Sequence, residues 1–180
     1  MSNQLKKGTQ MNAQNKPQAF EVNNAEGRAY WGMGILWTIL ATAEDTNGEY
    51  SCIEELIPQG PAAPPHIHEA ADETFYIMEG EATFFVEDQS IKATTGSFVS
   101  IPRGTKHAFQ IDSETVRLLN TYVPAGFEYM IMATTVPAEV RTLPPASMPF
   151  PDQEQSNREM AQIIQKYPAA KTNFLQGYEG

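Results

Sequence analysis

Three histidines and one glutamate have the residue types and the spacing that a metal site requires. His66 and His68 are separated by one residue, Glu73 follows five residues later, and His107 comes directly after the turn sequence "IPRGTK". Imidazole nitrogens and carboxylate oxygens are common ligands of divalent first-row metals. Residues i and i+2 of a strand share one face, so His66 and His68 can point at the same spot. The pattern predicts a metal site with His66, His68, Glu73 and His107 as ligands.

The alternative is that these histidines are hydrogen-bonded residues of an ordinary core. The chain contains 3 histidines, and each of them occupies a position that the metal hypothesis needs. A scattered set of core or surface histidines would not show this arrangement, so the metal site is favoured. The metal itself is left open among Mn, Fe, Co, Ni, Cu and Zn, because the same ligands accept most divalent first-row ions.

The sequence around these residues predicts many short strands. Apolar or alternating runs are separated by turn residues such as Asn47-Gly48, a strong hairpin signal. Short, evenly spaced strands of this kind are typical of an antiparallel jelly-roll β-barrel, so the predicted fold class is all-β. The predicted strands cover residues 33–43, 49–58, 73–79, 81–87, 97–101, 107–111, 115–123 and 127–135.

The two ends of the chain differ from this barrel. Residues 1–28 are polar and predict an N-terminal arm, residues 29–140 form the predicted barrel, and residues 141–180 begin with a Pro-rich connector. Within the last segment, Ser156 and Glu159 have the spacing of a capping box. An apolar stripe at helical spacing follows and predicts a C-terminal amphipathic helix, formed by Met160, Ile163, Ile164 and Tyr167. This helix either covers the mouth of the barrel or packs on an outer sheet face.

Composition narrows the expected partners and compartment. The chain has 22 acidic and 12 basic residues and a formal charge of -10, without a basic run that could follow a phosphate backbone. Nucleic acid is therefore not an expected partner. The apolar run of residues 29–43 is too short to span a bilayer, so a membrane is not expected either. The single cysteine, Cys52, excludes an internal disulfide and favours a reducing, cytoplasmic location.

Two stretches resemble the two motifs of the cupin superfamily. Residues 60–80 read G-x5-H-x-H-x4-E-x6-G, and residues 96–107 read G-x5-P-x-G-x2-H. The resemblance implies a cupin barrel, in which the three histidines and the glutamate named above bind one divalent metal. It also implies a homodimer, which is common in the family. One position departs from the pattern, since the second motif often ends in Asn where this chain has Ile111. The matching positions are Gly60, His66, His68, Glu73, Gly80, Gly96, Pro102, Gly104 and His107.

Within the cupins, residues 30–178 resemble the bacterial quercetin 2,3-dioxygenases. The resemblance is carried by "ADETFYIMEGEATFFV", "IPRGTKHAFQI" and "VPAGFEYM", followed by the connector and helix. It implies an enzyme that opens the heterocyclic ring of a small aromatic substrate, a flavonol, with O2. In such an enzyme Glu73 would be a metal ligand, the base that takes the substrate's 3-hydroxyl proton, or both.

Strand alternation also predicts the lining of a substrate pocket. Phe75 and Ile77 share a face with Glu73, and Phe109 and Ile111 share a face with His107. These four residues are predicted to line an apolar pocket beside the metal, and plain core packing is the alternative.

Fold and metal do not name a reaction, so other functions stay open. One is a different metal-dependent cupin enzyme, such as an acireductone-type dioxygenase or an isomerase. Another is a cupin that binds a metal or metabolite without turnover.

Overall fold

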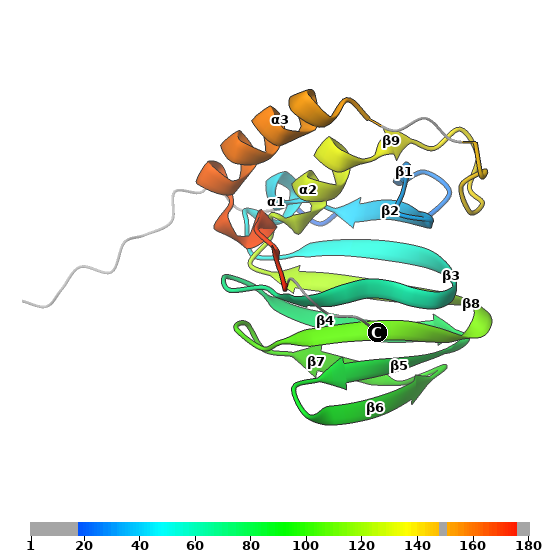
Figure 1. The fold of residues 1–180 in the computed structure, drawn as a ribbon. Helices are drawn as coiled ribbons and strands as arrows, with labels where there is room; N and C mark the ends of the chain where they lie inside the picture. Colours follow the sequence, from blue (N-terminus) through cyan, green and yellow to red (C-terminus); the bar gives the residue numbers. More distant parts are fainter. Residues whose placement is uncertain (1–17, 148–150, 176–180) are drawn as a thin grey trace, which may run out of the picture.

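The computed structural model describes residues 18–147 and 151–175, and β-strands dominate this part of the chain (Figure 1). Residues 18–27 precede the first strand, and the rest of the predicted arm, residues 1–17, lies outside the described residues. In chain order the elements are β1 (Arg28–Gly32), β2 (Ile35–Ala41), α1 (Ala43–Thr46), β3 (Ser51–Ile67), β4 (Asp72–Glu79), β5 (Glu81–Val86), β6 (Gln89–Thr94), β7 (Phe98–Ile101), β8 (His107–Val123), α2 (Phe127–Thr134), β9 (Val136–Pro137), α3 (Gln153–Lys166), η2 (Pro168–Ala170) and β10 (Asn173–Phe174).

Two long antiparallel strands, β3 and β8, run through both walls of the barrel. The first part of β8 pairs with β5 and with the end of β3, whereas its last part pairs with β4 and with the start of β3. The register shifts near Gly60, whose φ of 117° lies in a region that suits glycine. All strand pairs are antiparallel, and the predicted all-β jelly roll is confirmed.

The barrel interior is filled by side chains that alternate inward from these strands. Phe75 of β4 lies against Phe84 of β5 and Phe109 of β8, with ring centroids 4.8 and 5.3 Å apart. Ile77 and Ile111 are also buried in this cluster. Burial of such side chains is the main favourable contribution to folding, at about 1.5–3 kcal/mol for each large apolar residue.

Several details of the predicted strands are wrong. The predicted strand at residues 127–135 is instead helix α2 (Phe127–Thr134), because a short apolar run fits a buried helix as well as a strand. The Glu128 carboxylate of this helix accepts hydrogen bonds from the backbone N–H groups of Ala43 and Gly126. Residues 107–111 and 115–123 belong to one continuous strand, β8. Strands β1 and β6 are absent from the prediction, and most residues of β6 are exposed and polar. Strand β3 also continues to Ile67, beyond the predicted end at residue 58.

The predicted hairpin at Asn47-Gly48 joins β2 to β3, which pair antiparallel as expected. Both residues have positive φ, 61° and 83°. The connection is longer than a two-residue turn, however, because α1 precedes it and Asn47 forms the left-handed C-cap of that helix.

The C-terminal helix is present but begins earlier than the capping-box pattern predicts. Asp152, rather than Ser156, is the N-cap of α3, and its carboxylate accepts a hydrogen bond from the Gln155 N–H at 2.7 Å. Helices α2 and α3 lie together beyond β1 and β2 (Figure 1), and the rings of Tyr129 and Tyr167 stack at 4.6 Å. The helix thus packs on α2. In residues 18–147 and 151–175, no helix has the length and apolar character needed to cross a membrane.

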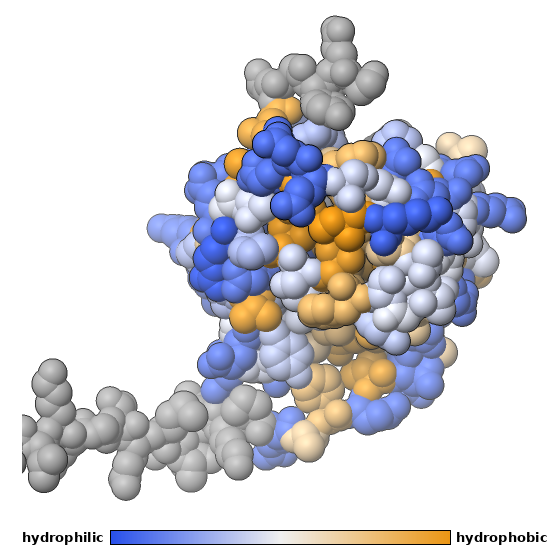
Figure 2. Space-filling view, turned by 90° about the horizontal axis from the view of Figure 1, so that it is seen from below, coloured by the Kyte–Doolittle hydropathy of each residue, from blue (hydrophilic) through white to orange (hydrophobic). Residues whose placement is uncertain are grey.

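The opposite side of the molecule, beyond β5, β6 and β7, exposes apolar side chains. Seen from below, an apolar band flanked by polar residues crosses this face (Figure 2). The large exposed apolar residues of these three strands are Phe85, Ile91 and Phe98. Isolated exposed apolar residues are common, but a contiguous group is typical of an interaction surface.

Candidate metal centre

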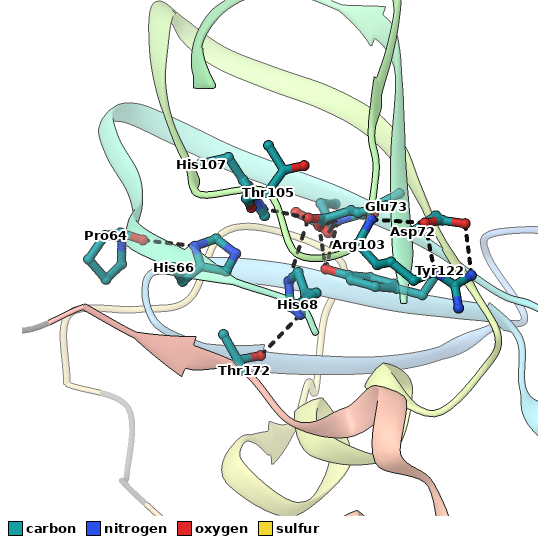
Figure 3. A network of polar contacts seen from close by, with 12 residues as sticks. Pro64, His66, His68, Asp72, Glu73, Arg103, Thr105, His107, Tyr122 and Thr172 are labelled. Atoms are coloured by element: carbon teal, nitrogen blue, oxygen red, sulfur yellow. Dashed lines mark hydrogen bonds and ion pairs between the residues drawn. The ribbon is translucent and has the colours of Figure 1, made fainter. Parts of the chain in front are cut away.

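The four predicted ligands meet inside the barrel, as Figure 3 shows. His66 lies near the end of β3 and His68 directly after it, Glu73 lies at the start of β4, and His107 is the first residue of β8. His66 and His107 face each other as register partners across β3 and β8. The potential ligand atoms all lie within 4.8 Å of one another, and all four residues are buried.

Hydrogen bonds join the bend that precedes Glu73 to the turn that precedes His107. The Asp72 carboxylate accepts hydrogen bonds from the backbone N–H and the guanidinium of Arg103, at 2.9 to 3.0 Å (Figure 3). Hydrogen bonds from Arg103 lower the pKa of Asp72 to about 2. The Gly104 N–H also donates to the His68 carbonyl at 2.8 Å. The bend between His68 and Glu73 is thereby tied to the turn that precedes His107.

Backbone carbonyls orient two of the imidazoles. His66 Nδ1 lies 2.8 Å from the Pro64 carbonyl oxygen, and His107 Nδ1 lies 3.0 Å from that of Thr105. A carbonyl can only accept, so Nδ1 carries a proton in both rings and Nε2 is the nitrogen that faces the other ligands. This arrangement around metal-binding histidines fixes the ring orientation and makes Nε2 the ligand atom.

The two carboxylate oxygens of Glu73 have different surroundings. Oε1 accepts hydrogen bonds from Asn120 Nδ2 at 2.9 Å and from the Tyr122 hydroxyl at 2.6 Å. Oε2 lies 2.8 Å from His107 Nε2 and 3.5 Å from His68 Nε2. One oxygen is thus anchored to β8 while the other faces the imidazole nitrogens.

The pKa shifts of Glu73 and His66 suit metal binding. Burial disfavours the charged form of Glu73, but the hydrogen bond from His107, the charges of His68 and His107 and the Tyr122 hydroxyl outweigh it and lower its pKa to about 2. Burial and the nearby His107 lower the pKa of His66 to about 4, so this imidazole is neutral at pH 7. Burial opposes protonation of His107, but its hydrogen bond to Glu73 prevails and raises its pKa. A metal ion would displace the proton that His107 Nε2 shares with Glu73.

These residues fit a divalent first-row metal ion. Ligand atoms about 2.1 Å from a metal lie about 3 Å apart when adjacent and about 4 Å apart when opposite in an octahedron, which agrees with the close grouping here. His68 Nε2 is buried and makes no hydrogen bond to any described residue. A buried nitrogen without a partner is costly, and a metal ion would satisfy it. The group can therefore bind a metal, and its identity stays open.

A cavity of about 70 Å³ adjoins the ligands. Of the predicted pocket residues, Phe109 lines this cavity together with His66 and Glu73. Phe75, Ile77 and Ile111 are not among its lining residues and lie in the packed core. They share the inward face of the ligands, as predicted, but lie further along their strands. The remaining lining residues are Met33, Ile35, Trp37, Glu55, Ala62, Ala63, Pro64, Asn120, Tyr122, Phe127, Met130, Thr172 and Phe174.

Several polar residues of this cavity were missed from the sequence, and alternation could have indicated them. Ile53, Glu55 and Ile57 alternate inward on β3, so Glu55 is a carboxylate at a core position. Asn120 and Tyr122 alternate in the same way on β8. A polar residue at an inward position of an apolar strand is the available signal.

The segment after α3, rather than α3 itself, lies at the cavity. Phe174 of β10 is the register partner of His66, and the two ring centroids are 5.8 Å apart. Thr172 Oγ1 lies 3.5 Å from His68 Nδ1 (Figure 3). Phe174 lines the cavity although 57% of its surface is exposed, so this segment borders the mouth.

Comparison with known proteins agrees with this geometry. Residues 52–122 match the model of the cupin domain family. A quercetin 2,3-dioxygenase of Bacillus subtilis is 30% identical over 109 residues, which cover 61% of this chain and 32% of that enzyme. The quercetin 2,3-dioxygenase of Aspergillus japonicus is 32% identical over 69 residues, which cover 36% of this chain and 20% of that enzyme. The matches thus span a third or less of these relatives' length.

Solved structures share the fold at low sequence identity. A protein from Thermotoga maritima, described as a predicted oxalate decarboxylase, has a TM-score of 0.54 at 16% identity, covering 58% of this chain and 99% of that one. KdgF from Halomonas sp. has a TM-score of 0.52 at 19% identity, covering 59% of this chain and 94% of that one. The solved structures thus share the fold, residues 52–122 match the cupin domain family, and the chain resembles the quercetin 2,3-dioxygenases in sequence.

Proposed function

We propose that this protein is a metal-dependent dioxygenase that cleaves the heterocyclic ring of a flavonol-like aromatic substrate with O2. The observation that carries the proposal is a buried group of three histidines and one glutamate at the wall of a mainly apolar cavity. The two quercetin 2,3-dioxygenases with related sequence support the same reaction class. Cupin fold alone would support no particular chemistry.

The ligand residues have distinct tasks in this proposal. His66, His68 and His107 would hold the metal through Nε2, and Glu73 would complete the set through Oε2. A bound divalent metal would supply a Lewis acid that stabilises a deprotonated substrate oxygen. The pKa of about 2 favours Glu73 as a ligand over a base, because a weakly basic carboxylate is a poor proton acceptor at neutral pH.

The cavity wall would exclude water from the reacting atoms. Trp37, Phe109 and Phe127 place aromatic surface around the metal site. The cavity of about 70 Å³ is smaller than the roughly 300 Å³ or more of a pocket for a multi-ring ligand. A flavonol would therefore require Phe174 and Met33, which are both largely exposed at the mouth, to move apart.

Metal reconstitution tests the proposal directly. The purified chain is stripped of metal, loaded in turn with Mn, Fe, Co, Ni, Cu or Zn, and mixed with quercetin in air. The expected result is loss of the visible absorption of quercetin with at least one redox-active metal, and none with the His107→Ala variant under the same conditions. Absence of loss with every metal, despite one metal bound per chain, would overturn the flavonol reaction.

The same reconstituted samples separate the rival functions. Turnover of an acireductone or an isomerisable small molecule, without quercetin loss, would assign the site to another cupin enzyme. Metal binding without turnover of any of these would assign it to a binding protein. Glu73→Gln distinguishes the two roles of Glu73, since loss of metal indicates a ligand and loss of turnover at full metal content indicates a base.

Two further expectations stay predictions. A homodimer agrees with the exposed apolar residues of β5, β6 and β7, among which Phe98 is 64% exposed. Comparing the size of the wild-type chain in solution with that of Phe98→Lys tests whether this face forms the dimer. A cytoplasmic location stays a prediction from the single cysteine and would be tested by cell fractionation.

A further inference from the structure

A second polar group lies in the same cavity, next to the metal ligands. Glu55 of β3 and Asn120 of β8 line the cavity and are only 1% and 2% exposed. Neither residue is one of the four candidate metal ligands. Most of the other cavity residues near them are apolar, including Ile35 and Trp37. Buried carboxyl and amide groups of this kind are costly unless they have partners, so their presence calls for a ligand or a structural role.

Asn120 connects this polar group to the metal site. Its Nδ2 donates to Glu55 Oε1 at 2.9 Å and to Glu73 Oε1 at 2.9 Å, and it lies 3.0 Å from the Tyr122 hydroxyl. The other end of the same amide, Oδ1, is buried and accepts no hydrogen bond from any described residue. Asn120 therefore holds the two carboxyl groups with its nitrogen and keeps one acceptor unused.

Glu55 complements that acceptor with a donor. Burial raises the pKa of the Glu55 carboxyl to about 8, and the negative charge of Glu73 contributes to the rise, although the hydrogen bond from Asn120 opposes it. At neutral pH the carboxyl group accordingly keeps its proton and can donate an O–H. A hydroxyl group of a ligand both donates and accepts, so it can satisfy Asn120 Oδ1 and the Glu55 carboxyl together.

We propose that Glu55 and Asn120 form a polar subsite that binds one hydroxyl group of the substrate while a neighbouring substrate oxygen faces the metal site. The subsite adjoins the metal site because a single amide nitrogen bonds to both Glu55 and Glu73. The favoured substrate therefore carries oxygen atoms on adjacent carbons, as in a catechol, an enediol or a hydroxyketone. This inference rests on the proposed function, because the ligand of the subsite is the substrate that the metal site would act on.

Ligand binding to the zinc-loaded protein tests the subsite without turnover. Catechol and phenol are suitable probes, because a single ring requires the least movement of the mouth. Trp37 lines the cavity and reports binding by fluorescence, and Trp31→Phe, present in all samples, removes the other tryptophan. The expected result is that Glu55→Met weakens catechol binding about tenfold, equivalent to one lost hydrogen bond, and leaves phenol binding unchanged.

Two matched variants control this comparison. Glu55→Gln keeps the size and an N–H donor, so it should bind catechol like the wild type. Glu54→Gln changes the adjacent residue, whose side chain pairs with Arg117 and does not line the cavity, so it should have no effect on either ligand. Zinc content and thermal unfolding verify that each variant is folded, and Glu55→Ala replaces the Met variant if that one does not fold.

The outcomes separate the subsite from the proposed function. Unchanged catechol affinity in folded Glu55→Met, or an equal loss for phenol and catechol, overturns the subsite even if the enzyme cleaves quercetin. Selective loss of catechol binding in a protein that cleaves no flavonol supports the subsite and overturns the dioxygenase proposal.

Discussion

The inward faces of β4 and β8 contain two regions that differ in chemistry. At one end of these faces lie Glu73 and His107, which belong to the candidate metal site. Further along the same faces lie Phe75, in contact with Phe84, and Ile111. Strand alternation places all four residues inside the barrel. Alternation thus determines which face a side chain occupies, whereas its position along the strand determines whether it meets the cavity or the packed core.

The two regions also depend on different forces. The metal end is held by charge-assisted hydrogen bonds between buried groups, such as those that Glu73 accepts from β8. The core end is held by close packing of aromatic and aliphatic side chains, where a lost side chain leaves a void. Substitutions at the metal end should therefore change metal content, and substitutions at the core end should change the free energy of unfolding.

The largest effect is expected from His107→Ala. Loss of one imidazole from a site with three leaves an incomplete ligand set, so metal affinity and any metal-dependent turnover should fall by about 100-fold or more. Elemental analysis after dialysis measures the metal content, and thermal unfolding of the metal-free protein measures stability. A variant that retains one metal per chain would show that His107 is not a ligand.

Phe75→Ala should lower the stability of the protein and leave metal binding unchanged. Phe75 is fully buried in the core, and truncation of such a side chain lowers the free energy of unfolding by about 3–5 kcal/mol. Urea unfolding of the metal-free protein measures this change, and Phe75→Leu is the matched control with a smaller loss. Metal stoichiometry of the folded fraction should stay at the wild-type value, and its loss would mean that the two regions are not separable.

Glu55→Gln should change how the stability of the metal-free protein depends on pH. The folded-state pKa of about 8 lies above the ordinary glutamate value of 4.5, because burial and the Glu73 charge favour the protonated carboxyl. The wild type therefore loses stability as the pH rises from 4.5 to about 8, by about 1.4 kcal/mol per pH unit at most. Thermal unfolding of both metal-free proteins at pH 5 and pH 8 should show Glu55→Gln gaining stability relative to the wild type at pH 8. If the two proteins differed in stability by the same amount at pH 5 and at pH 8, the result would contradict a buried, uncharged carboxyl at position 55.

The smallest effect is expected from Thr172→Val. Its hydroxyl lies 3.5 Å from His68 Nδ1, at the limit of a hydrogen bond, so its loss should weaken metal binding by about tenfold or less. Competition with a chromophoric chelator measures this affinity. The same substitution should leave the unfolding of the metal-free protein unchanged, and a marked destabilisation would assign Thr172 to packing instead.

The sequence predicted the fold class and the four grouped ligands, because local alternation and turn residues carry that information. It did not predict depth along a strand, so Phe75, Ile77 and Ile111 were expected at the pocket but lie in the core. Helix α2 was predicted as a strand, since its apolar run has no distinctive period and Glu128 is satisfied by groups that only the tertiary structure brings near. The role of Asn120 likewise depends on Glu55 and Glu73, which are distant from it in sequence.

The pairing of β3 with β8 has a consequence for the order of folding. His66 and His107 become neighbours only when these two strands pair, and the chain between them must close as a loop first. Folding dominated by such distant pairings is slow, on the order of milliseconds to seconds. A metal ion would then find its full ligand set late, after most of the barrel has formed. It would slow unfolding more than it accelerates folding, so that the bound metal protects the finished barrel more than it guides its assembly.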